Sequence, residues 1–275
     1  MQKRIAVIND LSCFGRCAIS ISMPILSASG LEVCTLPTAV LSSHFAFPNP
    51  VYIDTTEHFE NIKNHWNSLN LKFDAIFTGF IGSLDMIKMV SLFIDMFKGD
   101  NTKVIVDPTM ADNGKFYSSP IFTAEYLEEM KELCKKADII MPNITEACLL
   151  VGKEYIQGPY KIEYIESLLK NFEQTVILTG VYFNDNEIGC TLKEFSKKPE
   201  YIFSSKINGH YFGTGDIFGS TFVGAILKGF SYKDATKIAA DFVSICIEKS
   251  NKVNTDNVRG INFEQNLGKL IEMLK

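Results

Sequence analysis

The segment Gly209–Ser220, GHYFGTGDIFGS, joins a glycine-rich turn to the start of a helical pattern. Gly213, Thr214 and Gly215 can turn successive backbone N–H groups toward one point, and the positive end of the following helix strengthens that field. Such a turn suits a phosphate group. Asp216 comes next, and it is either a helix cap or a base that accepts a proton from a hydroxyl group.

A second carboxylate occurs in PNITE at 142–146, where Asn143 and Glu146 stand three residues apart. This spacing is typical of a capping box, in which the two side chains satisfy N–H groups at the start of a helix. The same carboxylate could organise Mg²⁺ near phosphate groups, because Mg²⁺ combines few protein ligands with phosphate oxygens and water. One glutamate can serve both roles.

Asp107 in VDPTM follows an apolar run and precedes a proline that favours an extended turn. By itself it would be interpreted as a turn cap. Together with Glu146 and Asp216 it predicts three carboxylates around one site, which a polyphosphate tolerates only through Mg²⁺ or flanking basic groups.

Short apolar runs alternate with longer stretches of helical periodicity, which predicts βαβ units around a mostly parallel sheet. The runs lack polar alternation, as expected of strands that helices cover on both faces. The predicted strands are Arg4–Asn9, Glu32–Pro37, Asp74–Gly79, Lys103–Asp107, Asp138–Pro142 and Thr175–Gly180. The predicted helices between them include Ser83–Lys98, Thr123–Lys136 and Tyr160–Phe172.

The pattern changes after Gly180, where two antiparallel strands and then three helices are predicted. The strands are Glu187–Lys193 and Glu200–Ser204, and the helices are Asp216–Lys228, Tyr232–Lys249 and Phe263–Leu274. With no internal repeat and no low-complexity linker, residues 1–275 are expected to form a single domain.

Ligands of open α/β sheets bind beyond the carboxyl ends of the strands, so polar residues at those positions are the first candidates for a site. They are Asn9, Asp10, Thr38, Gly79, Asp107, Asn143, Glu146 and Thr179. The predicted topology places all of them around one crevice.

The composition argues against several classes of protein. The net charge of −5 comes without a basic cluster, so a nucleic-acid partner is not expected. Neither a secretion signal nor an apolar run of membrane-spanning length is found, so no membrane association is expected. Seven cysteines at irregular spacing fit a reduced cytoplasm better than a disulfide framework.

The order of the DP turn, PNITE and GTGD along the chain resembles the ribokinase-like superfamily. Within it, IAVINDLSCFGRCA, LPTAVLSSH, TGFIGS and DPTM look like the pyridoxal/pyridoxamine kinase branch, and the resemblance spans almost the whole chain. It implies a three-layer α/β fold and transfer of the γ-phosphate of ATP to the 5′-hydroxymethyl group of pyridoxal, pyridoxine or pyridoxamine. Mg²⁺ is the implied cofactor and a homodimer is expected, while a requirement for K⁺ stays open.

The resemblance also implies roles for individual residues. Asp216 would remove the proton of the substrate hydroxymethyl group, and Gly213, Thr214 and Gly215 would form the anion hole. The nucleotide and Mg²⁺ side would comprise Asp107, Asn143, Glu146 and Thr179, with Asp107 and Glu146 at the metal. The side facing the vitamin ring would comprise Asn9, Asp10, Thr38 and His44.

Two positions depart from relatives of this branch. Asp10 stands where pyridoxal kinases often have serine, and it could pair with the ring nitrogen or an amine of the substrate. Thr179 stands where some relatives carry a lysine against the nucleotide phosphates, so ATP binding is expected to depend more on Mg²⁺.

Sugar kinases of this superfamily usually insert a β-sheet lid early in the chain, and the segment Ala39–Asp54 is too short for one. We expect a compact flap instead, whose His44, Phe45, Phe47 and Tyr52 could cover a planar ring. An ordinary hydrophobic loop packed on its own domain is the alternative.

Two rival functions follow from the same residues. Hydroxymethylpyrimidine kinase of thiamine synthesis resembles this branch in fold, in catalytic turn and in its flat heteroaromatic alcohol. A non-catalytic vitamin-binding protein is the rival from another class, and the intact GTGD and NxxE motifs argue against it.

Overall fold

The computed structural model describes residues 2–117, 121–207, 209, 211–252 and 257–275. Among them, nine strands form one sheet in the order β11-β10-β9-β8-β5-β4-β1-β2-β3. The parallel strands are β1 (Arg4–Ser12), β2 (Glu32–Leu41), β4 (Ala75–Thr78), β5 (Lys103–Val106), β8 (Ile139–Ile140) and β9 (Thr175–Val181). The antiparallel strands at the two edges are β3 (Tyr52–Asp54), β10 (Glu187–Lys193) and β11 (Glu200–Ser205). A separate short ladder joins β6 (Ala111–Asp112) and β7 (Lys115–Phe116).

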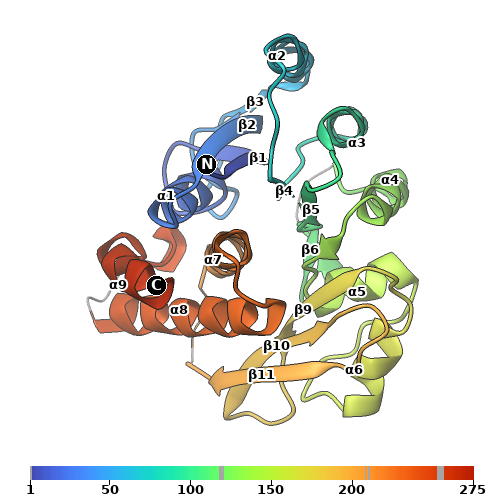
Figure 1. Ribbon diagram of the computed structural model, residues 1–275. Coiled ribbons are helices and arrows are strands. Elements are labelled where there is room, and N and C mark those ends of the chain that lie inside the picture. The colour runs from blue at the N-terminus through green and yellow to red at the C-terminus, as the bar shows by residue number, and fades with distance from the viewer. Residues whose placement is uncertain (1, 118–120, 208, 210, 253–256) are drawn as a thin grey trace.

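Helices cover both faces of the sheet, which explains why the central strands are apolar throughout (Figure 1). One face carries α1 (Ile19–Ala28), α7 (Thr214–Lys228), α8 (Tyr232–Lys252) and α9 (Leu267–Met273). The other carries α2 (Thr56–Ser68), α3 (Leu84–Phe97), α4 (Ala124–Lys135), α5 (Ile144–Val151) and α6 (Ile162–Leu169). The predicted three-layer α/β fold is therefore confirmed. None of the helices in the described part of the chain has the length and apolar character needed to cross a membrane.

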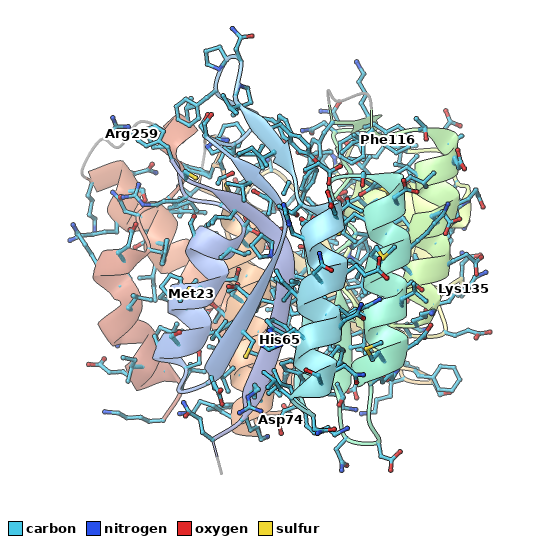
Figure 2. All side chains as sticks on the ribbon, turned by 90° about the horizontal axis from the view of Figure 1, so that it is seen from above. Met23, His65, Asp74, Phe116, Lys135 and Arg259 are labelled. Carbon is cyan, nitrogen blue, oxygen red and sulfur yellow. The ribbon has the colours of Figure 1, made fainter. Side chains whose placement is uncertain are left out.

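The side chains of β1 show how one strand serves two cores. Ile5 and Val7 belong to the core beneath α1 and α7, whereas Ala6 and Ile8 belong to the core on the opposite face. This alternation between two apolar environments leaves no polar face. Figure 2 shows the resulting layers, with Met23 of α1 and Lys135 of α4 on opposite sides of the sheet.

The strands β1 and β2 run further than the sequence predicts, to Ser12 and Leu41. Their register shifts after Asn9, which pairs with Pro37, so that Leu11 pairs with Val40. A bulge at this point lets the ladder continue past Pro37, which has no N–H to donate. Asn9, Asp10 and Thr38 consequently lie within strands and not beyond them.

The flap predicted over Ala39–Asp54 is built on a short hairpin. Its last residues form β3, which pairs with the end of β2 from Ala39↔Asp54 to Leu41↔Tyr52. The predicted flap therefore includes one short edge strand, and these described residues form no lid with a sheet of its own. The ring of Phe45 lies 5.9 Å from that of Phe80, so the flap packs over the end of β4.

The carboxyl ends of the parallel strands meet at one end of the sheet. Asp74, just before β4, lies at the opposite end from Arg259 and Phe116 (Figure 2). Here β1 pairs with β2 on one side and with β4 on the other, so the order of the strands along the chain reverses at β1. Such a switch point leaves room between neighbouring connections, and open α/β sheets bind ligands there.

Candidate functional site

A cavity of about 510 Å³ lies at this switch point. Of the residues predicted at the site, all line it except Thr38, Gly79 and the flap residues Phe47 and Tyr52. Aromatic side chains form much of the remaining wall, among them Phe45, Phe80, Tyr117 and Phe122. A volume of this order accommodates a small ligand together with part of a nucleotide.

Thr38 is fully buried and does not reach the cavity. Its hydroxyl group donates a hydrogen bond of 2.7 Å to the backbone oxygen of Phe80, whose ring does line the cavity. The structure therefore gives Thr38 a supporting position behind the wall and not a place at the predicted ring contact.

The GTGD turn forms the N-terminus of α7, which begins at Thr214 with Gly213 as its N-cap. Gly213 has φ +82°, and a Cβ atom there would lie 2.7 Å from both the backbone oxygen of Arg16 and Cδ1 of Ile21. No described side chain caps the first turn of α7. The first N–H groups of this helix, which lack partners inside the helix, are thus left for a ligand in the cavity.

Asp216 lies in this first turn, but its side chain does not cap the helix. The hydrogen-bond donors that act on the pKa of its carboxyl group are the backbone N–H of Ala18 and the side chain of Asn9. Burial raises the pKa of Asp216, and these two hydrogen bonds act in the opposite direction. A raised pKa brings a carboxylate closer to the range in which it accepts and returns protons near neutral pH.

Asp10 and Asp107 are the acidic neighbours of Asp216. Burial, and next the charge of Asp216, raises the pKa of Asp10 to about 7, against the hydrogen bond of 3.0 Å that Ser12 Oγ donates to it. The same two causes raise the pKa of Asp107 to about 7, against a hydrogen bond of 3.0 Å from Thr109 Oγ1. Two further carboxylates, Asp112 and Glu146, line the cavity, and no lysine or arginine lines it within the described chain. The cavity therefore favours cations.

Asn143 and Glu146 form the predicted capping box at the start of α5. The N–H of Glu146 donates to Asn143 Oδ1 over 2.9 Å, and the N–H of Asn143 donates to Glu146 Oε2 over 3.0 Å. Glu146 Oε1 accepts from the N–H groups of Met110 and Ala111, so it also anchors the turn that follows Asp107. Burial and the charge of Asp107 raise the pKa of Glu146, while its backbone donors lower it. Thr179, in β9, forms a bridge with Asn143.

His44 connects the flap to the segment after α8. Its Nδ1 accepts from the N–H of Ala46, so Nε2 carries the proton and donates to the backbone oxygen of Val258 over 2.7 Å. Burial lowers the pKa of His44, against the hydrogen bond to Val258. Both ring nitrogens are engaged by the protein, so what His44 contributes to the cavity wall is its ring carbons. His210, from the glycine-rich segment, lies outside the described residues.

Comparison with known proteins gives the family. The model of the phosphomethylpyrimidine kinases matches residues 55–260. The chain belongs to this family. Among curated proteins it is similar to pyridoxal kinase of Dictyostelium discoideum, 24% identical over 256 residues that cover 87% of this chain and 82% of that protein. It is also similar to the hydroxymethylpyrimidine/phosphomethylpyrimidine kinase of Bacillus subtilis, 31% identical over 183 residues that cover 66% of each protein.

Solved structures agree with this assignment to the phosphomethylpyrimidine kinase family. A protein of Bacteroides thetaiotaomicron, provisionally described as a phosphomethylpyrimidine kinase, is 34% identical with a TM-score of 0.92, covering 98% of this chain and 94% of that one. A second crystal form of the Bacteroides protein contains pyridoxal. Pyridoxal kinase from Lactobacillus plantarum is 26% identical with a TM-score of 0.91, covering 99% of this chain and 98% of that one. The predicted resemblance to pyridoxal kinases is confirmed.

Several residues of the site were not predicted from the sequence. Ala18 holds Asp216 through its backbone N–H, which no side-chain pattern reveals. Phe80 follows Gly79 at a strand end already singled out, so it could have been found as the apolar neighbour of that glycine. Ser12 donates a hydrogen bond to Asp10. It could have been predicted, because its hydroxyl group lies two residues from a carboxylate already assigned to the site.

Proposed function

We propose that this chain is a kinase that transfers the γ-phosphate of ATP to the 5′-hydroxymethyl group of pyridoxal, pyridoxine or pyridoxamine. The observation that carries the proposal is the place of Asp216, a half-buried carboxylate beside the uncapped N-terminus of α7 in a cavity with aromatic walls. A base, an anion site and a surface for a flat ring thus meet in one cavity. The pyridoxal kinases among the relatives and the Bacteroides structure with pyridoxal support this substrate class.

In the proposed reaction, Asp216 accepts the proton of the substrate hydroxyl group as its oxygen attacks the γ-phosphorus and the bond to the β-phosphate oxygen breaks. The N–H groups at the start of α7 stabilise the negative charge on the transferred group. Phe45 and Phe80 hold the ring of the vitamin from the flap and from the end of β4. Most of the rate enhancement would come from this positioning and charge stabilisation.

Mg²⁺ fits the acidic side of the cavity, and Asp107 and Glu146 would hold it together with water and phosphate oxygens. No lysine or arginine among the described residues lines the cavity, so phosphate charges entering it need a cation, and bound Mg²⁺ would supply that neutralisation. Asp107, whose described partner is Thr109, has more free lone pairs than Glu146, which binds three backbone N–H groups. The described residues contain no cluster of three or more histidine, cysteine, aspartate or glutamate side chains that could hold a metal ion by itself. Mg²⁺ does not require such a cluster, because it keeps several non-protein ligands.

The setting of the enzyme is also a proposal. We infer that residues 1–275 act as one domain, supported by the continuous sheet, and that the protein works in the cytoplasm, where its seven free cysteines would stay reduced. We also propose a homodimer, because apolar side chains are exposed at the edge strand β3 and just before it. Val51 is 62% exposed and Ile53 is 54% exposed.

A substrate panel with ATP consumption as readout tests the proposed function. We expect turnover of pyridoxal or pyridoxamine to exceed that of hydroxymethylpyrimidine and of ribose, because the aromatic walls and the short flap favour a flat ring of this size. If hydroxymethylpyrimidine were the best substrate, the chain would act in thiamine synthesis instead. A preference for ribose would contradict the interpretation of the flap.

Asp10 offers a test of vitamer choice. Above a pH of about 7 its carboxylate is ionised in the free enzyme and can pair with a cationic amine, whereas below that pH it is protonated. We therefore expect the ratio of kcat/KM for pyridoxamine to that for pyridoxal to rise as pH increases through 7. Asp10→Asn keeps an acceptor for Ser12 and should flatten this rise. A ratio with the same pH dependence in both proteins would remove Asp10 from the ring side.

A further inference from the structure

We propose that Asn9 is a positioning residue that holds the carboxylate of Asp216 in the orientation needed for proton transfer. The inference rests on the proposed function, in which Asp216 is the base. It replaces the sequence-based expectation that Asn9 faces the vitamin ring.

The hydrogen bonds of Asn9 fix which way its amide points. Oδ1 accepts from the backbone N–H of Asp10 over 2.9 Å and from that of Phe80 over 2.8 Å. A carbonyl oxygen has two lone pairs, and both are used here. Flipping the amide would set its NH₂ group against two N–H donors, so Nδ2 must point the other way. Both residues line the cavity, and hydrogen bonding from the Asn9 side chain lowers the pKa of Asp216. Asn9 is 2% exposed, so bulk water does not compete for these bonds.

Gly79 at the end of β4 leaves the space that this amide occupies. A Cβ atom on residue 79 would lie 2.3 Å from Nδ2 and 2.5 Å from Cγ of Asn9. The N–H of Gly79 also donates to the backbone oxygen of Ile8, which fixes β4 against β1 at this level. The amide is therefore confined by sterics as well as by the two backbone hydrogen bonds that Oδ1 accepts.

Ala18 holds Asp216 from the other side. Its N–H reaches the carboxylate because the residue adopts φ 50° and ψ −129°, a conformation that costs an L-residue energy and favours glycine. Two donors from separate elements, β1 and the turn before α1, thus restrict the rotation of one carboxylate. Asp216 itself lines the cavity, where the substrate hydroxyl group would bind.

The test compares Asn9→Leu with Thr102→Val. Thr102 lies before β5 at the far end of the sheet, and its buried hydroxyl group accepts from the N–H of Gly99 and donates to the backbone oxygen of Phe73. Both variants lose buried polar bonds and should lower Tm. We expect Asn9→Leu to lower kcat about 10- to 100-fold, the range for a hydrogen bond to a charged group, with little change in KM for ATP or pyridoxal. Thr102→Val should keep the kcat of the wild type.

A double variant shows whether Asn9 acts through Asp216. In the Asp216→Asn background, Asn9→Leu should cause little further loss of kcat, since the carboxylate that it positions is gone. If Asn9→Leu is too unstable to assay, the same loss of kcat is expected for Asn9→Ser, because the short serine side chain cannot reach both Phe80 and Asp216.

Three results would overturn this role for Asn9. They are a kcat of Asn9→Leu or Asn9→Ser within about twofold of the wild type, a loss confined to KM, or an equal loss with and without Asp216. If Asp216→Asn alone kept normal kcat, the proposed function would fail at the base itself. A deficient Asp216→Asn beside a normal Asn9 variant would instead reject only the positioning role.

Discussion

Asp216→Asn is expected to lower kcat about 10²- to 10⁴-fold while ATP and pyridoxal still bind, because asparagine has the size of aspartate but cannot take up a proton. The anion site should survive, since the N–H groups of α7 belong to the backbone and Gly213 sets the turn. Loss of the base would then appear in kcat and leave KM for both substrates near the wild-type values.

The interpretation of Asp216 as a helix cap makes a different prediction. Asparagine and aspartate cap helices about equally well, so a capping role would leave kcat unchanged. The structure already disfavours this role, because the side chain of Asp216 makes no cap hydrogen bond and instead accepts from Ala18 and Asn9. In the variant, the new NH₂ group and the amide of Asn9 compete as donors, so a moderate fall in Tm is expected as well.

Asp234→Asn is the matched control for this experiment. Asp234 also lies in the first turn of a helix, α8, where it is exposed and bonded to Ser231. Its replacement should alter stability by less than about 1 kcal/mol and leave kcat at the wild-type value. Thermal melting with and without ATP shows whether each variant is folded and still binds. A folded Asp216→Asn protein with near-normal kcat would contradict the proposed mechanism.

The central sheet was predictable because its strands are continuous apolar runs, which parallel topology requires when helices cover both faces. The helix α1 was not predicted. Its sequence ISISMPILSA alternates like a strand and contains Pro24, and its helical state depends on packing against β1 and α7. The edge strand β3 escaped notice for the opposite reason, since both of its faces are exposed and impose no pattern.

The position of the site was also predictable, because parallel strands bring their carboxyl ends together whatever lies between them in the chain. The direction in which each side chain points was not. Thr38, beside the register shift that follows Asn9, donates to the backbone oxygen of Phe80. The amide oxygen of Asn9 accepts from the backbone N–H of Phe80, which lies beyond the end of β4. These contacts join segments that are distant in sequence, so local spacing carries no trace of them.

The two glycines of the GTGD turn should respond differently to alanine. Gly213→Ala places a side chain at φ +82° and brings its Cβ within 2.7 Å of the backbone oxygen of Arg16, so we expect a loss of about 1–3 kcal/mol of stability together with activity. Gly215 lies within α7, is exposed and has nothing within 4 Å of a Cβ position. Packing therefore does not require glycine there.

We expect Gly215→Ala to leave the protein as stable as the wild type or up to about 1 kcal/mol more stable, because alanine favours the helix. Its kcat/KM for ATP should nevertheless fall about 10- to 100-fold, since the methyl group would keep a phosphate about 1 Å from its place against the N–H groups. Gly268→Ala in α9, also exposed and with nothing within 4 Å of its Cβ position, is the control and should change stability without changing turnover. Chemical denaturation and steady-state kinetics on the same preparations separate the two effects. A Gly215→Ala enzyme with wild-type kcat/KM for ATP would show that the phosphate does not approach this turn, and the anion site would have to be sought elsewhere in the cavity.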